Sequence, residues 1–410
     1  MGRRQRNELQ NGNRMRWLYY NQNDPTEARA HDRVLRQIDD WWKEFLKQTD
    51  RLDALFRQAE NWDLADWMHR ELQSIHPELM WEYGPAVKVH GHRLVITPEI
   101  QSELRPLTET LIERAPRIPG WEFYSYRLRE DVQAALQTVD VRCDLNIEGV
   151  TVAVAQGDNN RIDLSYRWKR LPEDDDQAFN AAFVATETLL GEKFLDRWVG
   201  TINLVDDITP VEQGQRFLSL DRLEPTFRSL VESIRAQLPA EPYSAIADDG
   251  QWAMLKLEPE EARDYPERYD LMTCITCNPD LIAATFSPAP FFSERYSRVD
   301  ETFCYVKIDG SGDLTDMGFH DREDMEEAAR IALEAQDTGA LIGGGTGLRY
   351  SYLELALTDV DRGIAAIQRA MREGNVPRRS WILFHDADLN AEWIGIYDDS
   401  PAPPVEKVER

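Results

Sequence analysis

The amino-acid sequence predicts an α+β protein with two tandem ferredoxin-like α/β sandwich domains, the first preceded by short helices. Its 410 residues exceed the usual length of one domain, so two compact units are expected. A hydrophobic content of 42%, with 12 Trp, 14 Tyr and 14 Phe, supplies apolar surface for two cores. In both halves, segments with helical spacing alternate with short β-type segments in β-α-β order, which indicates a ferredoxin-like sheet.

The two ends of the chain are polar and lack a sustained apolar period. Residues 1–33 predict a disordered basic arm, and the Pro-rich, charged residues 399–410 predict a disordered tail. In the first sixteen residues the only acidic residue is Glu8, and it is accompanied by five arginines, Arg3, Arg4, Arg6, Arg14 and Arg16. Such an arm can touch an anionic surface, but its composition favours a solvated tail.

The first domain is predicted over residues 34–205. Apolar residues recur at helical spacing from Val34 to Leu72, which predicts three short amphipathic helices. The segments WEYGPAVKV and HRLVIT predict two strands joined by a tight turn at His90-Gly91, where glycine permits a positive φ.

The rest of this domain predicts a helix that ends at Pro116, then an aromatic strand, WEFYSYR, and a short helix, EDVQAALQTV. A strand pair, VTVAVAQ and RIDLSYR, is followed by a long helix interrupted near Gly191 and by the strand TINLV. Residues 93–205 are therefore expected to form two β-α-β passages packed on one sheet.

Residues 206–245 predict a Pro-containing connector with a helix from Leu223 to Leu238, and residues 246–398 predict the second domain. Its expected elements are, in order, the strands WAMLKLE, LMTCITC and FCYVKID, the helix DREDMEEAARIALEAQ, the strands ALIGG and LRYSYLELAL, the helix DVDRGIAAIQRAMREG, and the strands SWILFHD and EWIGIYD. Thr358 or Asp359 caps the second helix and Gly374 closes it. From Phe303 the order is β-α-β-β-α-β with an extra edge strand.

The formal net charge of −27 restricts the classes of partner. Like-charge repulsion disfavours a broad nucleic-acid or membrane surface and favours a cationic partner. No apolar run reaches the length needed to cross a bilayer, and the N-terminus lacks the apolar core of a signal peptide. The sequence therefore predicts a cytoplasmic protein, in which the four cysteines, Cys143, Cys274, Cys277 and Cys304, are reduced.

Two motifs have both a chemical and a structural interpretation. Cys274 and Cys277 have the spacing of a zinc or redox pair, with Cys304 as a third thiol, but no second pair follows, and burial as small hydrophobes is favoured. Gly343, Gly344 and Gly345 suggest a phosphate cradle, but a strand follows them instead of a helix. A β-bulge or a crowded strand crossing is favoured, and backbone contact with a partner stays open.

The remaining polar clusters are predicted to be structural. The clustered imidazoles His69, His76, His90 and His92 suggest a metal site, but Gly91 marks a turn, and His90 and His76 are expected to be exposed loop residues. The segment from His385 to Asn390 lacks the glycine and the final glutamate of a calcium loop, and Asp309, Ser311 and Asp313 fail similarly, so both predict polar turns. Glu187, Glu192 and Asp196 are expected on a solvated helix edge.

Residues 115–123, APRIPGWEF, lie after an apolar helix and before a strand, and they resemble the most recognisable segment of an uncharacterised bacterial domain-of-unknown-function family. The aromatic helix around Trp41, Trp42 and Phe45 and the segment from Leu190 to Val205 also resemble it. The C-terminal half resembles a region often coupled to that family and is similar in element order to the ferredoxin-like ribonuclease E inhibitor family. The resemblance implies no catalytic residues.

The predicted function is a non-catalytic binding or regulatory protein whose acidic surface engages a basic protein partner, such as an RNA-processing enzyme, a ribosomal protein or a toxin. Acidic residues 173–176, 258–264 and 321–327 are candidate contacts. The alternative is an enzyme or small-ligand-binding protein with its site in the inter-domain cleft. No catalytic residue, metal or cofactor is predicted, and the candidate binding residues are Trp121, Tyr124, Glu173, Asp174, Asp175, Asp176, Gly343, Gly344, Gly345 and His385.

Overall fold

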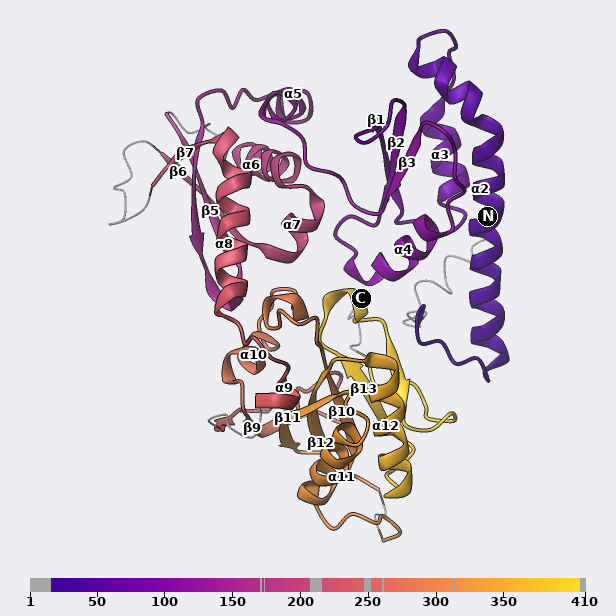
Figure 1. Ribbon diagram of the computed structural model, residues 1–410, viewed down its shortest axis with the longest axis vertical. Coiled ribbons are helices and arrows are strands. Elements are labelled where there is room, and N and C mark those ends of the chain that lie inside the picture. Colours follow the sequence, from indigo (N-terminus) through magenta and orange to yellow (C-terminus); the bar gives the residue numbers. More distant parts are fainter. Residues whose placement is uncertain are drawn as a thin grey trace. The chain divides into compact units, whose positions relative to one another are not determined.

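The computed structural model describes residues 16–169, 172, 174–206, 216–246, 252–259, 262–312 and 315–405. The chain divides into two compact units. The N-terminal unit is Ala28–Ile234. The C-terminal unit is Arg235–Arg410 together with the described part of Met1–Glu27, so one unit contains segments from both ends of the chain (Figure 1).

The N-terminal unit contains two separate sheets with helices packed on them (Figure 1). Its elements are, in chain order, α2 (Pro25–Phe56), α3 (Leu64–Leu72), β1 (Met80–Pro85), β2 (His92–Thr97), α4 (Arg105–Glu113), β3 (Trp121–Tyr124), α5 (Val132–Cys143), β4 (Thr151–Gln156), β5 (Ile162–Trp168), α6 (Asp175–Leu190), α7 (Glu192–Trp198), β6 (Val199–Asp206), β7 (Leu218–Ser219) and α8 (Leu223–Gln237).

The first sheet has the order β1-β2-β3. Strands β1 and β2 are antiparallel, with Met80 opposite Thr97, as the predicted hairpin requires. Gly91 in their turn has a φ of 152°, and a side chain there would collide with the Gly120 carbonyl. Helix α4 then carries the chain to β3, which pairs with β2 in parallel.

The second sheet has the order β6-β5-β4-β7, with β5 and β6 parallel and the other neighbours antiparallel. Its core joins strand residues such as Leu164 and Tyr166 to Ala181 and Ala185 of α6 and Phe227 of α8. The prediction of one ferredoxin-like sheet over residues 93–205 is therefore wrong. The aromatic residues of β3 pack against α2, and β4 and β5 pack against α5 to α8, so the two strand groups do not share a sheet.

The helical prediction at the start of this unit also needs correction. Residues Pro25–Phe56 form one helix of 32 residues, not two short ones, and α3 follows it. The polar stretch from Lys47 to Asp50 lacks glycine and proline, so nothing in it interrupts the backbone hydrogen bonds. In contrast, the predicted interruption near Gly191 is confirmed, because Gly191 has a φ of 79° between α6 and α7.

The C-terminal unit is built on one seven-stranded sheet of order β14-β13-β10-β12-β11-β9-β8, antiparallel throughout. The predicted strands and the two long helices are confirmed. Its elements are α9 (Tyr243–Ile246), β8 (Ala253–Lys256), β9 (Leu271–Thr276), α10 (Pro279–Ala284), β10 (Thr302–Asp309), α11 (Arg322–Glu334), β11 (Gly339–Gly347), β12 (Tyr350–Leu357), α12 (Val360–Glu373), β13 (Ser380–Phe384) and β14 (Trp393–Gly395).

The two faces of this sheet are covered differently. Alternate residues of β10 and β12, such as Val306 and Leu353, pack against α11 and α12. The opposite residues, such as Phe303 and Tyr352, pack under α9, α10 and the loops of residues 262–270 and 285–301, which together we call the covering segment. Helix α10 was not predicted from the sequence.

The described part of the predicted N-terminal arm is ordered. The Trp17 amide donates a hydrogen bond to Glu392 at 2.7 Å, and Arg16 lies 3.5 Å from the centre of the Trp393 ring while it pairs with Glu27 at 2.7 Å. These contacts and the early start of α2 replace the disorder expected for residues 16–33. Arg3, Arg4, Arg6 and Arg14 lie outside the described residues.

Candidate binding pocket beside strand β3

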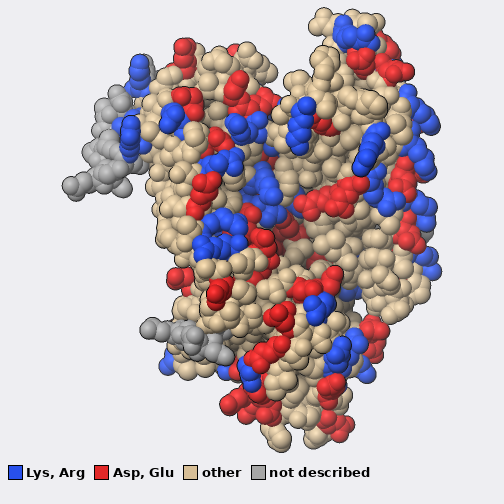
Figure 2. All heavy atoms as spheres, in the orientation of Figure 1, with Lys and Arg blue, Asp and Glu red and all other residues tan. Residues whose placement is uncertain are grey.

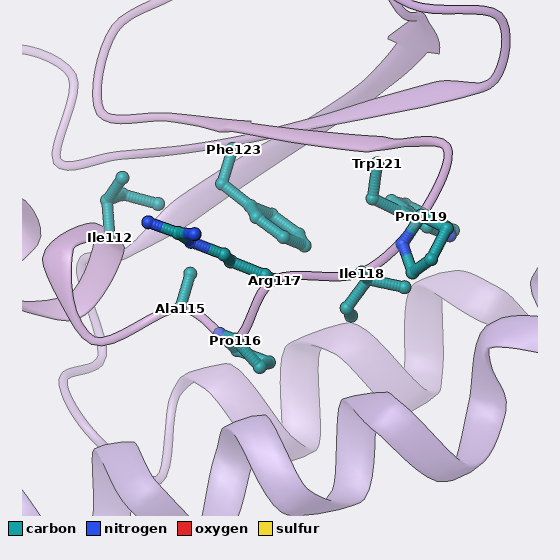
Figure 3. Close-up of a pocket in the computed structure, with 8 residues that line it drawn as sticks. All are labelled: Ile112, Ala115, Pro116, Arg117, Ile118, Pro119, Trp121 and Phe123. Carbon is teal, nitrogen blue, oxygen red and sulfur yellow. The ribbon is translucent and has the colours of Figure 1, made fainter.

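The N-terminal unit has an open surface pocket at the segment that joins α4 to β3 (Figure 3). Its volume is about 510 Å³, which is within the range of roughly 300–1,000 Å³ typical of ligand pockets. We call it the β3 pocket, and its lining residues are Ile112, Ala115, Pro116, Arg117, Ile118, Pro119, Trp121 and Phe123.

Local sequence determines the path of the chain around the β3 pocket. Helix α4 ends at Glu113, three residues before Pro116, which cannot continue a helix. Gly120 has a φ of 78°, so the chain turns there, and the Trp121 amide donates to the Ile118 carbonyl at 3.1 Å. Residues 115–119 and β3 therefore form the two sides of the pocket (Figure 3).

The aromatic wall of the β3 pocket is held from behind by α2. Trp121 and Phe123 lie on the same face of β3, with rings 6.2 Å apart and nearly parallel. Phe45 contacts Trp121 edge-on at 5.0 Å, and Trp42 contacts Phe123 at 4.8 Å. Trp42 also donates through Nε1 to the Leu111 carbonyl at 2.8 Å, which ties α2 to α4. The wall is therefore rigid before any ligand binds.

Arg117 is the only charged residue in the lining of the β3 pocket. Its side chain is exposed, and it extends across the pocket toward Ile112 (Figure 3). Among the described residues it forms no hydrogen bond or ion pair, whereas the nearby Arg114 is paired with Asp39 at 2.6 Å. An unpaired guanidinium beside apolar groups provides up to five donors for an anionic group.

The predicted binding residues Trp121 and Tyr124 lie on opposite faces of β3. Trp121 lines the pocket, while the Tyr124 hydroxyl donates to Glu122 at 2.7 Å on the other face. Glu122 also accepts hydrogen bonds from the amides of residues 87–89, the closest at 2.6 Å. Burial alone would raise the pKa of Glu122, but these hydrogen bonds lower it to about 2. Tyr124 therefore has a structural role on the face away from the pocket.

The glycine segment has the structural role that was favoured for it. Gly343, Gly344 and Gly345 lie inside β11, and the strand register shifts between Leu341 and Gly343 as in a β-bulge. A side chain on Gly343 would come within 2.7 Å of the Ile275 carbonyl, and one on Gly344 would collide with Glu326. These glycines let β11 approach β9 and α11 closely.

His385 belongs to a buried polar cluster under the covering segment. Its Nε2 lies 2.8 Å from Glu354, which also accepts a hydrogen bond from Arg268 at 2.5 Å. Tyr305 stacks on the imidazole at 4.9 Å, and Phe291 lies on another side of it. Burial lowers the pKa of His385, with Glu354 opposing and Arg268 reinforcing this effect. The cluster fastens the covering segment to β12.

The predicted acidic contacts mostly begin helices. Asp174 accepts from the amides of Asp176 and Gln177 at the start of α6, and Asp175 and Asp176 are exposed beside it. Glu173 lies outside the described residues, as do parts of the stretch 258–264. In α11, Asp321 is the cap, and Glu327 pairs with Arg330 at 2.7 Å. Figure 2 shows acidic and basic side chains interspersed on the visible face.

Burial keeps the cysteine thiols protonated. It raises the pKa of Cys274 to about 12 and that of Cys277 to about 11, and it raises the pKa of Cys304 further. Over the described ranges, no group of three or more His, Cys, Asp or Glu side chains is placed to hold a metal ion. In the same ranges, no helix is long and apolar enough to cross a membrane.

The helix edge at Glu187, Glu192 and Asp196 is not solvated as predicted. Glu192 is 2% exposed and pairs with Arg105 at 2.8 Å, and Asp196 pairs with the same guanidinium at 2.5 Å. Glu187 pairs with Arg127 at 2.8 Å. The sequence holds one signal of this network: Arg105 is the first residue of α4, where the helix dipole disfavours a cation.

The β3 pocket thus combines a rigid aromatic wall, a Pro-rich loop and one unpaired guanidinium, all built from the APRIPGWEF segment and the end of α4. The comparisons with known proteins do not identify the chain: no family model, no curated protein and no solved structure matches it.

Proposed function

We propose that this chain is a binding protein and that an apolar group of its partner enters the β3 pocket. The observation that carries the proposal is the composition of the lining: all residues except Arg117 are apolar, and Trp121 and Phe123 form a fixed wall. Sites with this mixture bind ligands through buried apolar area, while one polar group sets orientation. Because α2 already fixes the wall, little ordering entropy opposes binding.

We further propose that the partner is a basic protein. The net charge of −27 accelerates encounter with a cationic partner and disfavours nucleic acid. Exposed acidic residues at the start of α6, Asp175 and Asp176, are available for such contacts. An RNA-processing enzyme, a ribosomal protein and a toxin fit this description.

The antiparallel order β13-β10-β12-β11, with α11 and α12 on one face, supports a ferredoxin-like centre in the C-terminal unit.

The alternative function, an enzyme or a small-ligand-binding protein, has a different requirement. A general acid or base must lie within hydrogen-bond reach of the reacting group. The β3 pocket offers a guanidinium, and its lining contains no carboxylate or imidazole. The chemistry of this pocket therefore favours recognition over proton transfer.

Affinity capture with matched variants tests the proposed function. The immobilised full chain is exposed to a bacterial lysate at about 50 and about 300 mM salt, as wild type, as Ile118→Asp and as Ile100→Asp. Ile118 lines the pocket, whereas Ile100 is 82% exposed on the same unit and outside the lining. Both variants add one negative charge, so they differ in where the charge lies.

The expected result is a basic protein retained by the wild type and Ile100→Asp and depleted at least about tenfold by Ile118→Asp, with weaker retention at the higher salt. The proposal is wrong if all three baits retain the same proteins equally, or if none retains a specific protein at either salt.

A further inference from the structure

Strand β3 is the edge strand of its sheet. It pairs with β2 on one side, and no described strand pairs with its other side. The His92 amide donates to the Gly120 carbonyl at 2.8 Å, so the backbone groups of Gly120, and by alternation those of Glu122, point toward β2. The Trp121 carbonyl and the backbone amide and carbonyl of Phe123 then point to the free edge, whereas the Trp121 amide donates to the Ile118 carbonyl. This edge offers hydrogen-bond donors and acceptors to an added strand.

The free edge and the β3 pocket are formed by the same two residues. Trp121 and Phe123 direct their rings into the pocket, and the Trp121 carbonyl and the Phe123 amide and carbonyl face outward. A peptide that pairs with this edge therefore passes along the mouth of the pocket, where a side chain can enter it. This is the arrangement used in strand addition, in which main-chain bonds give affinity and pockets for side chains give specificity.

The charge at the pocket indicates what the bound peptide carries. Arg117 is the sole charged lining residue and forms no ion pair among the described residues, so it matches an anionic group next to an apolar one. The last residue of a protein, when it is apolar, carries the two groups on one Cα atom: its side chain and the terminal carboxylate. A chain that ends there also avoids the loop of residues 115–119 beside the strand.

We propose that the β3 edge binds the C-terminus of a partner protein as an added strand, with the last apolar side chain in the β3 pocket and the terminal carboxylate on Arg117. This inference rests on the proposed function and names the group that the pocket receives. The remainder of the partner can still be basic, because the carboxylate is the only anionic group that the pocket requires.

Peptide binding to the isotope-labelled full chain tests the inference. The probe is an equimolar mixture of acetylated pentapeptides Lys-Val-Thr-Val-Z, with Z as Leu, Ile, Phe or Trp, prepared with a free C-terminal carboxylate and, separately, as the C-terminal amide. The readouts are the dissociation constant from chemical-shift changes and the hydrogen-exchange protection of the Phe123 amide. Arg117→Gln removes the proposed partner, and Arg114→Gln is the control, because Arg114 is paired with Asp39.

The expected result is binding of the free acids at least about tenfold tighter than the amides, with protection of the Phe123 amide. Arg117→Gln should abolish this preference, and Arg114→Gln should keep it. The inference is overturned if neither mixture binds, if acids and amides bind equally, if the preference survives Arg117→Gln, or if binding leaves Phe123 unprotected.

These failures differ from failure of the proposed function. If lysate proteins remain dependent on Ile118 while acids and amides bind equally, the pocket binds an apolar group without a carboxylate. If the retention of no protein depends on Ile118, the proposed function is wrong, whatever the result of the peptide-binding experiment.

Discussion

Each unit of this protein contains a buried Arg–Glu pair, and the two pairs have different third members. In the N-terminal unit, Arg105 pairs with Glu192 and also with Asp196. In the C-terminal unit, Glu354 is shared between Arg268 and His385. The first cluster consists of one guanidinium and two carboxylates, whereas the second contains an imidazole, which can gain or lose a proton.

Both pairs connect segments that are distant in the sequence. Arg105 begins α4 beside the first sheet, and Glu192 begins α7 beside the second. Arg268 lies in the covering segment, and Glu354 lies in β12. Replacing the arginine should therefore have different consequences in the two units. Only the second cluster has a third group, His385, that can take up a proton and compensate for the lost charge.

The largest effect is expected for Arg105→Leu. The substitution leaves Glu192, which is 2% exposed, without its cation, and an uncompensated buried charge costs about 3–5 kcal/mol. Hydrogen exchange of the N-terminal unit in the full chain measures the loss, because it reports on each unit separately.

Lys43→Leu is the control for this substitution. Lys43 pairs with Asp40 on the surface of α2, with both side chains more than two-thirds exposed, so its removal should cost less than about 1 kcal/mol. Equal losses in the two variants would show that the buried link contributes no more than an exposed one.

A smaller, pH-dependent effect is expected for Arg268→Leu. Arg268 helps to hold the pKa of His385 below 6.5, so its removal lets Glu354 raise that pKa and the imidazole replaces the lost cation. A raised histidine pKa contributes stability that is present at low pH and is lost as the pH rises through it. The loss should therefore be smaller at pH 5.5 than at pH 8, by about 1 kcal/mol or more.

Hydrogen exchange of the C-terminal unit at the two pH values measures this difference. The double variant Arg268→Leu with His385→Phe is the control, since it has no imidazole to compensate. An equal loss of stability in the single variant at both pH values would show that His385 does not replace the lost cation.

Lys307 is another buried cation of the C-terminal unit. It donates to the carbonyls of Tyr265 and Glu267 at 2.5 and 2.6 Å and lies over the Tyr350 ring. Burial lowers its pKa from 10.5 to about 7, although Asp270 and Asp264 oppose the shift and Arg379 adds to it. Lys307 thus hydrogen-bonds to neutral carbonyls where Arg105 and Arg268 bond to carboxylates.

Lys307→Met tests the lowered pKa of Lys307 through the pH dependence of stability. The unfolded chain binds more protons than the folded one between pH 7 and 10.5, so wild-type stability should rise with pH in that window, by up to about 1.4 kcal/mol per pH unit. The variant should lose most of this rise between pH 7 and 8.5, a difference of up to about 2 kcal/mol. Parallel pH profiles of the two proteins would exclude the lowered pKa.

The elements of the C-terminal unit were predictable from the sequence because its central strands are short, mostly apolar runs that are buried on both faces. In β10 and β12, Lys307 and Glu354 occupy positions that otherwise carry Phe303, Tyr305, Tyr352 and Ala356. A charged residue inside a mostly apolar strand is a sequence signal of a buried ionic group, although it does not reveal the residue with which that group pairs. Arg268 could not be found in this way, since it lies in an irregular loop.

The N-terminal unit was harder to predict because local pattern does not determine which strands pair. Strands β3 and β5 were both identified, but their assignment to different sheets depends on packing between distant segments. Trp121 was predicted as a binding residue and lines the β3 pocket, yet Tyr124, three positions later, points to the other face. Arg117 has no sequence signal, since its importance comes from lacking a partner.

The smallest effect on stability is expected for Arg117→Gln. Arg117 is exposed and forms no ion pair among the described residues, so its removal should change the free energy of unfolding by less than about 0.5 kcal/mol. Thermal unfolding beside Arg105→Leu measures the contrast. An arginine kept for folding has buried carboxylates around it, whereas one kept for a ligand lacks a partner until the ligand arrives. A loss above about 1 kcal/mol would place Arg117 with the structural arginines and remove the reason to expect a carboxylate in the β3 pocket.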